Sequence, residues 1–226
     1  MYKRLSYDIS KRTPVYPGDV PVVIRSGKSI KRGDSCNTFS LAFSNHIGTH
    51  VDAPKHFWNS GRSINEFSPD ELVFDRPCLI DCRKGPGEAI EAVDISRSIR
   101  SRDFDILLIR TGFMRHREKN ARLYRYKNPY LSPDAAKWIR SEIPGLRAIG
   151  IDCISIGSFS DRAAGKLTHR TLLKESGPER SAILIVEDIN IPREVKAVRK
   201  LIIAPVFIDG VDSAPCTIIG EVRERI

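Results

Sequence analysis

The stretch from His46 to His56 most strongly constrains how this chain can fold. It holds three of the five histidines and one aspartate, and imidazole mixed with carboxylate is the donor set of a catalytic divalent-metal site. A straight strand would place His46 and His50 roughly 13 Å apart, at about 3.3 Å per residue, which is too far for one ion. The chain must therefore turn between them, either by a bend at Gly48, because glycine tolerates unusual dihedral angles, or by one turn of helix.

The second half of this stretch is predicted to begin as an extended segment, which ends at Pro54. His50 and Asp52 lie two residues apart, so in an extended segment they share a face and can share an ion. Pro54 must end regular structure before His56. The alternative is a solvated loop of ordinary polar residues, which would explain any one of these histidines better than it explains the whole set.

Two residues outside this stretch are candidates for the same chemistry. Glu187 ends a strongly apolar run, and a buried carboxylate is costly unless it is paired or bound to a cation. His169 is expected at the start of a helix that runs from Thr168 to near Gly177, where the helix terminus favours a neutral imidazole. Each residue alone is more simply explained as structural, but together they complete a second donor set. His116 lies between arginines and is not assigned to a metal.

The pattern of apolar residues predicts an α/β protein in which residues 1–226 form a single domain. Strands are expected over residues 4–10, 20–25, 37–44, 76–82, 106–110, 147–152, 181–187, 200–208 and 217–222. Helices are expected over residues 94–100 and 132–142, the latter with Ser132 as its N-cap and Pro133 at its first position. The segment Thr111–Leu131 is interpreted as either an active-site flap or a surface excursion.

Composition excludes several classes of protein. The net charge of +9 would suit nucleic acid, but the basic residues are spread along the chain without a recognisable nucleic-acid-binding motif, so a solvated surface is the better explanation. No apolar run is long enough to cross a bilayer, and the basic N-terminus lacks the apolar segment of a secretory signal. Five scattered cysteines indicate reduced thiols. We therefore expect a cytoplasmic protein with neither a nucleic-acid nor a membrane partner.

The order His-x-Gly-Thr-His-x-Asp-x-Pro-x-His-Phe, here His46 to Phe57, resembles the metal-dependent cyclase and kynurenine formamidase (arylformamidase) family, which includes isatin hydrolases. Weaker likeness extends over nearly the whole chain, including the stretches around Tyr7, Gly150, Thr168 and Glu187. The resemblance implies a swivelling β/β/α fold with a mixed central sheet. It also implies a homodimer or homotetramer that acts on a small molecule.

The resemblance further implies six metal ligands in two sets, namely His46, His50 and Asp52 for one ion and His56, His169 and Glu187 for a second. Asp52 would be able to bridge the two ions. Where only one ion binds, His56 or Glu187 would instead handle protons as catalytic residues. Zn²⁺ or Mn²⁺ suits mixed imidazole and carboxylate ligands, with one or two ions per chain.

The function expected from these ligands is hydrolysis of a C–N bond by a metal-activated water. The substrate would be an arylformamide such as N-formylkynurenine, as in tryptophan catabolism, or a cyclic amide. A cyclase, a lyase or an ester or lactone hydrolase on the same site is the alternative. A basic binding module with a purely structural metal is disfavoured, because structural zinc sites are usually rich in cysteine and this motif has none.

Overall fold

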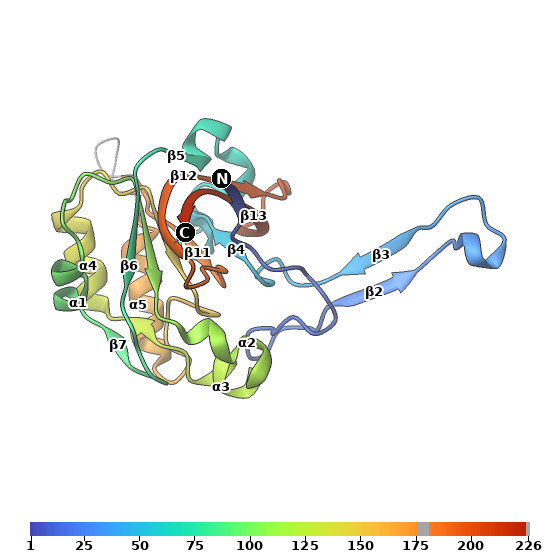
Figure 1. Ribbon diagram of the computed structural model, residues 1–226, viewed down its shortest axis with the longest axis horizontal. Helices are drawn as coiled ribbons and strands as arrows, with labels where there is room; N and C mark the ends of the chain where they lie inside the picture. The colour runs from blue at the N-terminus through green and yellow to red at the C-terminus, as the bar shows by residue number, and fades with distance from the viewer. Residues whose placement is uncertain (176–180, 225–226) are drawn as a thin grey trace.

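One mixed sheet forms the body of the protein and carries the candidate residues (Figure 1). The structure is a computed structural model that describes residues 1–175 and 181–224. Its strands are β1 (Tyr2–Arg4), β2 (Val23–Ser26), β3 (Phe39–Ala42), β4 (His50–Asp52), β5 (Val73–Phe74), β6 (Pro77–Asp81), β7 (Ala89–Ile90), β8 (Ile106–Arg110), β9 (Tyr130–Leu131), β10 (Ala148–Ile151), β11 (Leu184–Glu187), β12 (Val195–Pro205) and β13 (Ser213–Glu224). Its helices are α1 (Ala92–Ser98), α2 (His116–Lys119), α3 (Ala121–Tyr126), α4 (Pro133–Glu142) and α5 (Arg162–Leu172), with shorter 3₁₀ turns between them.

The main sheet has nine strands in the order β5-β12-β13-β4-β11-β10-β8-β6, with β1 alongside β13. The strands β11, β10, β8 and β6 run parallel to one another, whereas β4, β13, β12 and β5 pair antiparallel. The sheet curves until β12 lies against β6, so it is nearly closed. The expected α/β fold with a mixed central sheet is confirmed.

The buried strand β8 shows how apolar residues build two cores. Leu107 and Ile109 belong to a core shared with α1, α4 and α5, which cover one side of the sheet (Figure 1). Ile106 and Leu108 point the other way into a second core inside the curved sheet. Because both faces of this strand are covered, it is a continuous apolar run without polar alternation.

Capping residues decide where the two long helices begin. The Ser132 hydroxyl accepts a hydrogen bond from the Ala135 amide, 3.1 Å away, so α4 starts as predicted. The predicted start of the next helix at Thr168 is wrong. The helix α5 begins after Asp161, whose side chain caps the Ala164 amide. His169 therefore lies in its last turn, and the expected end near Gly177 falls outside the described residues.

Two other expectations change in the structure. The first strand ends at Arg4 rather than near residue 10, because the Tyr7 amide donates to the Thr49 hydroxyl instead of to a strand. The segment Thr111–Leu131 is neither a flap nor an excursion, because it folds into short helices with Tyr124 fully buried. No helix within residues 1–175 and 181–224 is long and apolar enough to cross a membrane.

A two-stranded ribbon leaves the body of the protein. The strands β2 and β3 pair antiparallel and project far from the main sheet (Figure 1). A small cluster at its root, formed by Val15, Val22 and Ile47 with neighbouring side chains, attaches the ribbon to the body.

Packing at the centre of the sheet is tight enough to predict the effect of one added methyl group. A Cβ on Gly150 would lie 2.4 Å from the Ile189 Cδ1 and 2.9 Å from the Leu108 Cδ2. We expect Gly150→Ala to lower the free energy of unfolding by about 1–3 kcal/mol, as overpacking of a core usually does. The matched control is Gly145→Ala, where the nearest atom would be 4.0 Å away. Equal urea midpoints for the two variants would contradict this packing.

Candidate metal centre

The pairing of β4 with β11 sets two carboxylates and a histidine side by side. Val51 points into the inner core, so His50 and Asp52 point from the opposite face of the strand. The antiparallel register places Glu187 directly opposite His50, where side chains of paired residues touch. This cross-strand register creates the centre, although Glu187 is distant from the histidine stretch in sequence.

A bend brings the flanking histidines onto the same centre. Gly48 has a φ of +59°, so the predicted bend is present and the alternative helical turn is wrong. The ring centroids of His46 and His50 are 5.2 Å apart. Beyond β4, the 3₁₀ turn Pro54–His56 returns the chain, and the His56 ring centroid lies 4.2 Å from that of His46.

The donor atoms form two overlapping groups among the residues that the structure describes. The groups are His46, Asp52 and His56, and His50, Asp52 and Glu187, with the donor atoms of each group all within 4.8 Å of one another. Asp52 belongs to both. The grouping differs from that implied by the resemblance, because the strand register pairs His50 with Glu187. His169 lies just outside these groups, with its Nε2 3.3 Å from the Glu187 Oε1.

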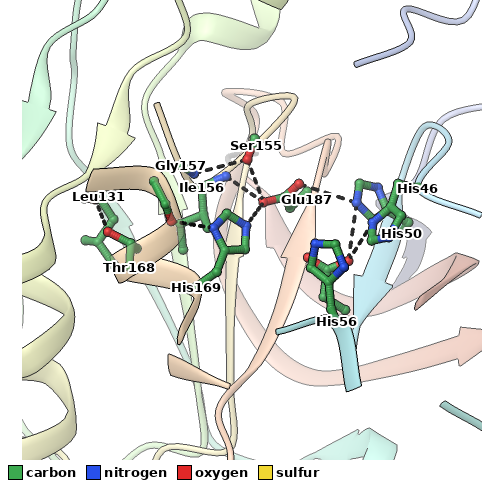
Figure 2. Close-up of polar contacts among 12 residues, drawn as sticks. His46, His50, His56, Leu131, Ser155, Ile156, Gly157, Thr168, His169 and Glu187 are labelled. Atoms are coloured by element: carbon green, nitrogen blue, oxygen red, sulfur yellow. Dashed lines mark hydrogen bonds and ion pairs between the residues drawn. The ribbon is translucent and has the colours of Figure 1, made fainter. Parts of the chain in front are cut away.

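Two of the histidines are held in the orientation of metal ligands (Figure 2). The Nδ1 of His50 donates to the Gly48 carbonyl and that of His169 donates to the Gly165 carbonyl, each at 2.8 Å. Because a carbonyl oxygen only accepts, Nε2 carries the lone pair of each neutral ring. Both Nε2 atoms face Glu187, at 3.3 Å. An acceptor facing a carboxylate is favourable only when a proton or a cation lies between them.

Unsatisfied polar atoms at the same place fit a divalent cation. The His50 Nε2 and both carboxylate oxygens of Asp52 are buried without a hydrogen-bond partner. The His46 Nδ1 is 3.0 Å from one Asp52 oxygen, which is an ion-pair distance without hydrogen-bond geometry. Leaving such groups uncompensated costs several kcal/mol. Imidazole nitrogens held by backbone carbonyls, together with carboxylate oxygens, are the ligand set of zinc and manganese enzymes.

Protons compensate these charges when no cation is present. Burial disfavours the charged form of His46, but the neighbouring carboxylates of Asp52 and Asp212 outweigh it and raise the pKa of His46 to about 10. Burial would raise the pKa of Glu187, but the facing imidazoles of His169 and His50 lower it to about 2. Glu187 is therefore ionised at neutral pH in the chain without a metal.

Asp212 is a further residue of the candidate metal centre, and the sequence analysis did not identify it. Its Oδ2 is 2.6 Å from the His56 Nδ1 and 3.1 Å from the His46 Nε2. Asn45 fixes the same carboxylate by donating to its other oxygen at 2.7 Å. Asp212 sits in a polar turn before β13, 156 residues from His56, so no local spacing could have signalled it.

The end of β11, which carries Glu187, is fixed by contacts of the next residue, Asp188. Asp188 has a φ of +52°, a strained conformation outside glycine. Arg117 binds its carboxylate through two nitrogens and the Tyr124 hydroxyl donates to it. The helical segment that was expected to be an active-site flap or a surface excursion therefore supplies the partners of the residue next to Glu187.

A cavity of about 370 Å³ opens over the donors. Phe57 forms part of its wall and stacks on the His169 ring, 4.9 Å between centroids. Trp58 turns away to the α5 side, where its indole donates to the Arg170 carbonyl. The remaining histidine, His116, packs against Phe113 and does not line this cavity. The centre is thus accessible to a small molecule.

The chain matches the Cyclase family over residues 4–158. It belongs to that family. A relative is cyclase-like protein 1 of Arabidopsis thaliana, 32% identical over 181 residues, which cover 74% of this chain and 68% of that protein. A kynurenine formamidase of Bacillus cereus is 24% identical over 218 residues, covering 93% of this chain and 92% of the relative.

Solved structures share the fold of this family member. Isatin hydrolase A from Labrenzia aggregata superposes over 100% of this chain and 94% of its own, with a TM-score of 0.80 and 19% sequence identity. At this identity the likeness extends to the fold alone.

The protonated histidines predict how metal affinity depends on pH. The pKa of His46 is raised to about 10, and the pKa values of His50 and His169 are raised as well, against burial, by the Glu187 carboxylate that both rings face. Because a metal must displace these protons, the affinity for Zn²⁺ or Mn²⁺ should rise as the pH is raised from 6.5 to 8.5. Chelator competition at several pH values measures it, and a flat profile would contradict the proton network.

Asp212 should support metal binding through the two histidines that it contacts. We expect Asp212→Asn to weaken metal affinity about 10- to 100-fold, as loss of a partner of the ligands commonly does. Asp209→Asn is the matched control, because Asp209 lies in the same turn and is exposed, with its side chain bonded to Asn65. If the two variants bind metal equally well, Asp212 does not support metal binding.

Proposed function

We propose that this protein is a metal-dependent hydrolase that cleaves the C–N bond of an arylformamide or a cyclic amide. The observation that carries the proposal is the pair of histidines whose Nε2 atoms face Glu187 beneath the cavity. Relatives named kynurenine formamidase and neighbours in fold named isatin hydrolase support the reaction class.

Six residues would hold the metal, namely His46, His50, Asp52, His56, His169 and Glu187. Asp52 is the one that can serve two ions, because it belongs to both donor groups. A bound Zn²⁺ or Mn²⁺ would lower the pKa of a water to about 7 and polarise the substrate carbonyl. Zinc with one or two ions per chain is our first choice, and manganese is the alternative.

Where only one ion binds, His56 would be free of the metal and would handle the proton of the reaction. Its Nδ1 is bound to Asp212, which leaves Nε2 as the nitrogen for the substrate, and the ring lines the cavity. In hydrolysis, the water oxygen bonds to the carbonyl carbon, the C–N bond breaks, and the leaving nitrogen takes a proton. His56 would deliver that proton, while ionised Glu187 would act as an acceptor and would hold His50 and His169.

The cavity suits a small aromatic substrate. Its volume of about 370 Å³ and its lining by Phe57 and Tyr16 would accept one planar ring system beside the donors. A cyclase or lyase that polarises a carbonyl, or an ester or lactone hydrolase, would use the same residues. Incorporation of ¹⁸O from water into the product separates hydrolysis from a reaction without water. We further propose a cytoplasmic role, with no nucleic-acid or membrane partner.

The test is a substrate screen on protein reconstituted with Zn²⁺ or Mn²⁺. N-formylkynurenine, isatin and simple aryl formamides and esters would be compared, and we expect turnover of a formamide or a cyclic amide. His50→Ala should lose metal and at least about a hundredfold in kcat/KM, because metal supplies several kcal/mol of transition-state stabilisation. His116→Ala is the control, since His116 lies outside the cavity. Full turnover by His50→Ala, or ester cleavage alone, would overturn the assignment.

A further inference from the structure

The helix α5 presents one of its faces to the cavity over the donors. Arg162, Gly165, Lys166 and His169 all line that cavity, and their spacing of three and four residues places them on one side of the helix. With a rise of about 1.5 Å per residue, Lys166 lies about 4.5 Å and Arg162 about 10.5 Å from His169 along the helix axis. His169 is buried, whereas the two basic residues are exposed. They therefore lie at the outer end of the cavity.

The charges of Arg162 and Lys166 are not neutralised by the protein. Neither side chain forms an ion pair with another residue of the described part of the chain. Two acids line the same cavity, Glu187 and Asp19, and Glu187 is buried against the histidines at the inner end. An anion that enters the outer end therefore meets two cationic groups and one carboxylate, that of Asp19.

Aromatic rings hold the Arg162 guanidinium beside the cavity. It lies over the Phe159 ring, 4.9 Å from the ring centroid, and the Phe159 ring meets the Tyr16 ring edge-on, with 5.9 Å between centroids. Tyr16 itself lines the cavity. A guanidinium stacked on a ring keeps the N–H groups at its edge, in a planar fork that matches the two oxygens of a carboxylate.

We propose that Arg162 and Lys166 bind a carboxylate that the substrate carries on the far side of its ring from the scissile amide. This inference rests on the proposed function, because the donors fix where the amide carbonyl lies. The ring would then lie beside Tyr16, between the donors and the two cationic groups. Asp19 would repel a second negative charge, so the site favours a carboxylate over a doubly charged phosphate or phosphonate.

The kinetic test compares two formamides on metal-reconstituted protein, 4-formamidobenzoate and 4-formamidobenzamide, which have the same shape and differ by one charge. The wild type should have a higher kcat/KM for the benzoate through a lower KM. Lys166→Gln and Arg162→Gln should each lower that kcat/KM about 10-fold or more, because each removes a hydrogen bond between charged groups, and should leave the benzamide unaffected. Lys137→Gln is the matched control, because it removes the same charge from α4 outside the cavity.

Charge reversal tests the contact itself. Lys166→Glu should prefer 4-(aminomethyl)formanilide, in which an ammonium group replaces the carboxylate, and so reverse the wild-type order of the two substrates. Lys166→Arg keeps the positive charge and should keep the wild-type order. The wild type should also prefer 4-formamidobenzoate to 4-formamidophenylphosphonate, and the opposite preference would overturn the assignment of a carboxylate.

A binding measurement separates failure of this inference from failure of the proposed function. 4-Acetylbenzoate and 4-acetylbenzamide have no leaving nitrogen on the acetyl group, so their affinities can be measured by calorimetry without turnover at that carbonyl. Lys166→Gln should bind 4-acetylbenzoate about 10-fold more weakly than the wild type does and 4-acetylbenzamide equally well. Equal affinity of both proteins for 4-acetylbenzoate would overturn the inference even in an active formamidase. Charge-dependent binding without any turnover would support the carboxylate site and overturn the proposed function alone.

Discussion

The centre depends on one electrostatic constraint, the presence of two imidazole lone pairs and a carboxylate in a buried space. The backbone carbonyls of Gly48 and Gly165 fix the Nδ1 protons of His50 and His169, so both rings turn Nε2 toward Glu187. Buried charge of this kind must be compensated. A proton compensates it in the bare chain, and a divalent ion would do so in its place, so metal affinity should depend on pH.

The rest of the molecule holds this arrangement rigid. The curved sheet sets His50 opposite Glu187, and the braced Asp188 fixes the end of β11 through Arg117 and Tyr124. Strain at a single residue persists only when its surroundings overdetermine it, and the two buried partners of Asp188 do so. Phe57 and Tyr16 form part of the cavity wall over the donors.

The sequence predicted what depends on local geometry and missed what depends on distant pairing. The need for the chain to turn between His46 and His50 followed from their spacing, although a bend and a helical turn both stayed open, and the start of α4 followed from Ser132. The helix that contains His169 was misplaced, because Thr168 resembles a cap and the true cap, Asp161, carries no stronger signal. The grouping of donors depends on the register between β4 and β11, and Asp212 reaches His56 across 156 residues. Neither the strand register nor the contact between Asp212 and His56 can be predicted from a local sequence pattern.

The short strand β4 also determines when the centre can exist during synthesis. It is held between β11 and β13, and the latter starts at Ser213 near the end of the chain. A ribosome that has released only the first two hundred residues has exposed all six donors but not the strand that closes the sheet over them. A chain truncated before β13 would therefore carry all six donors but lack one of the two strands that hold β4.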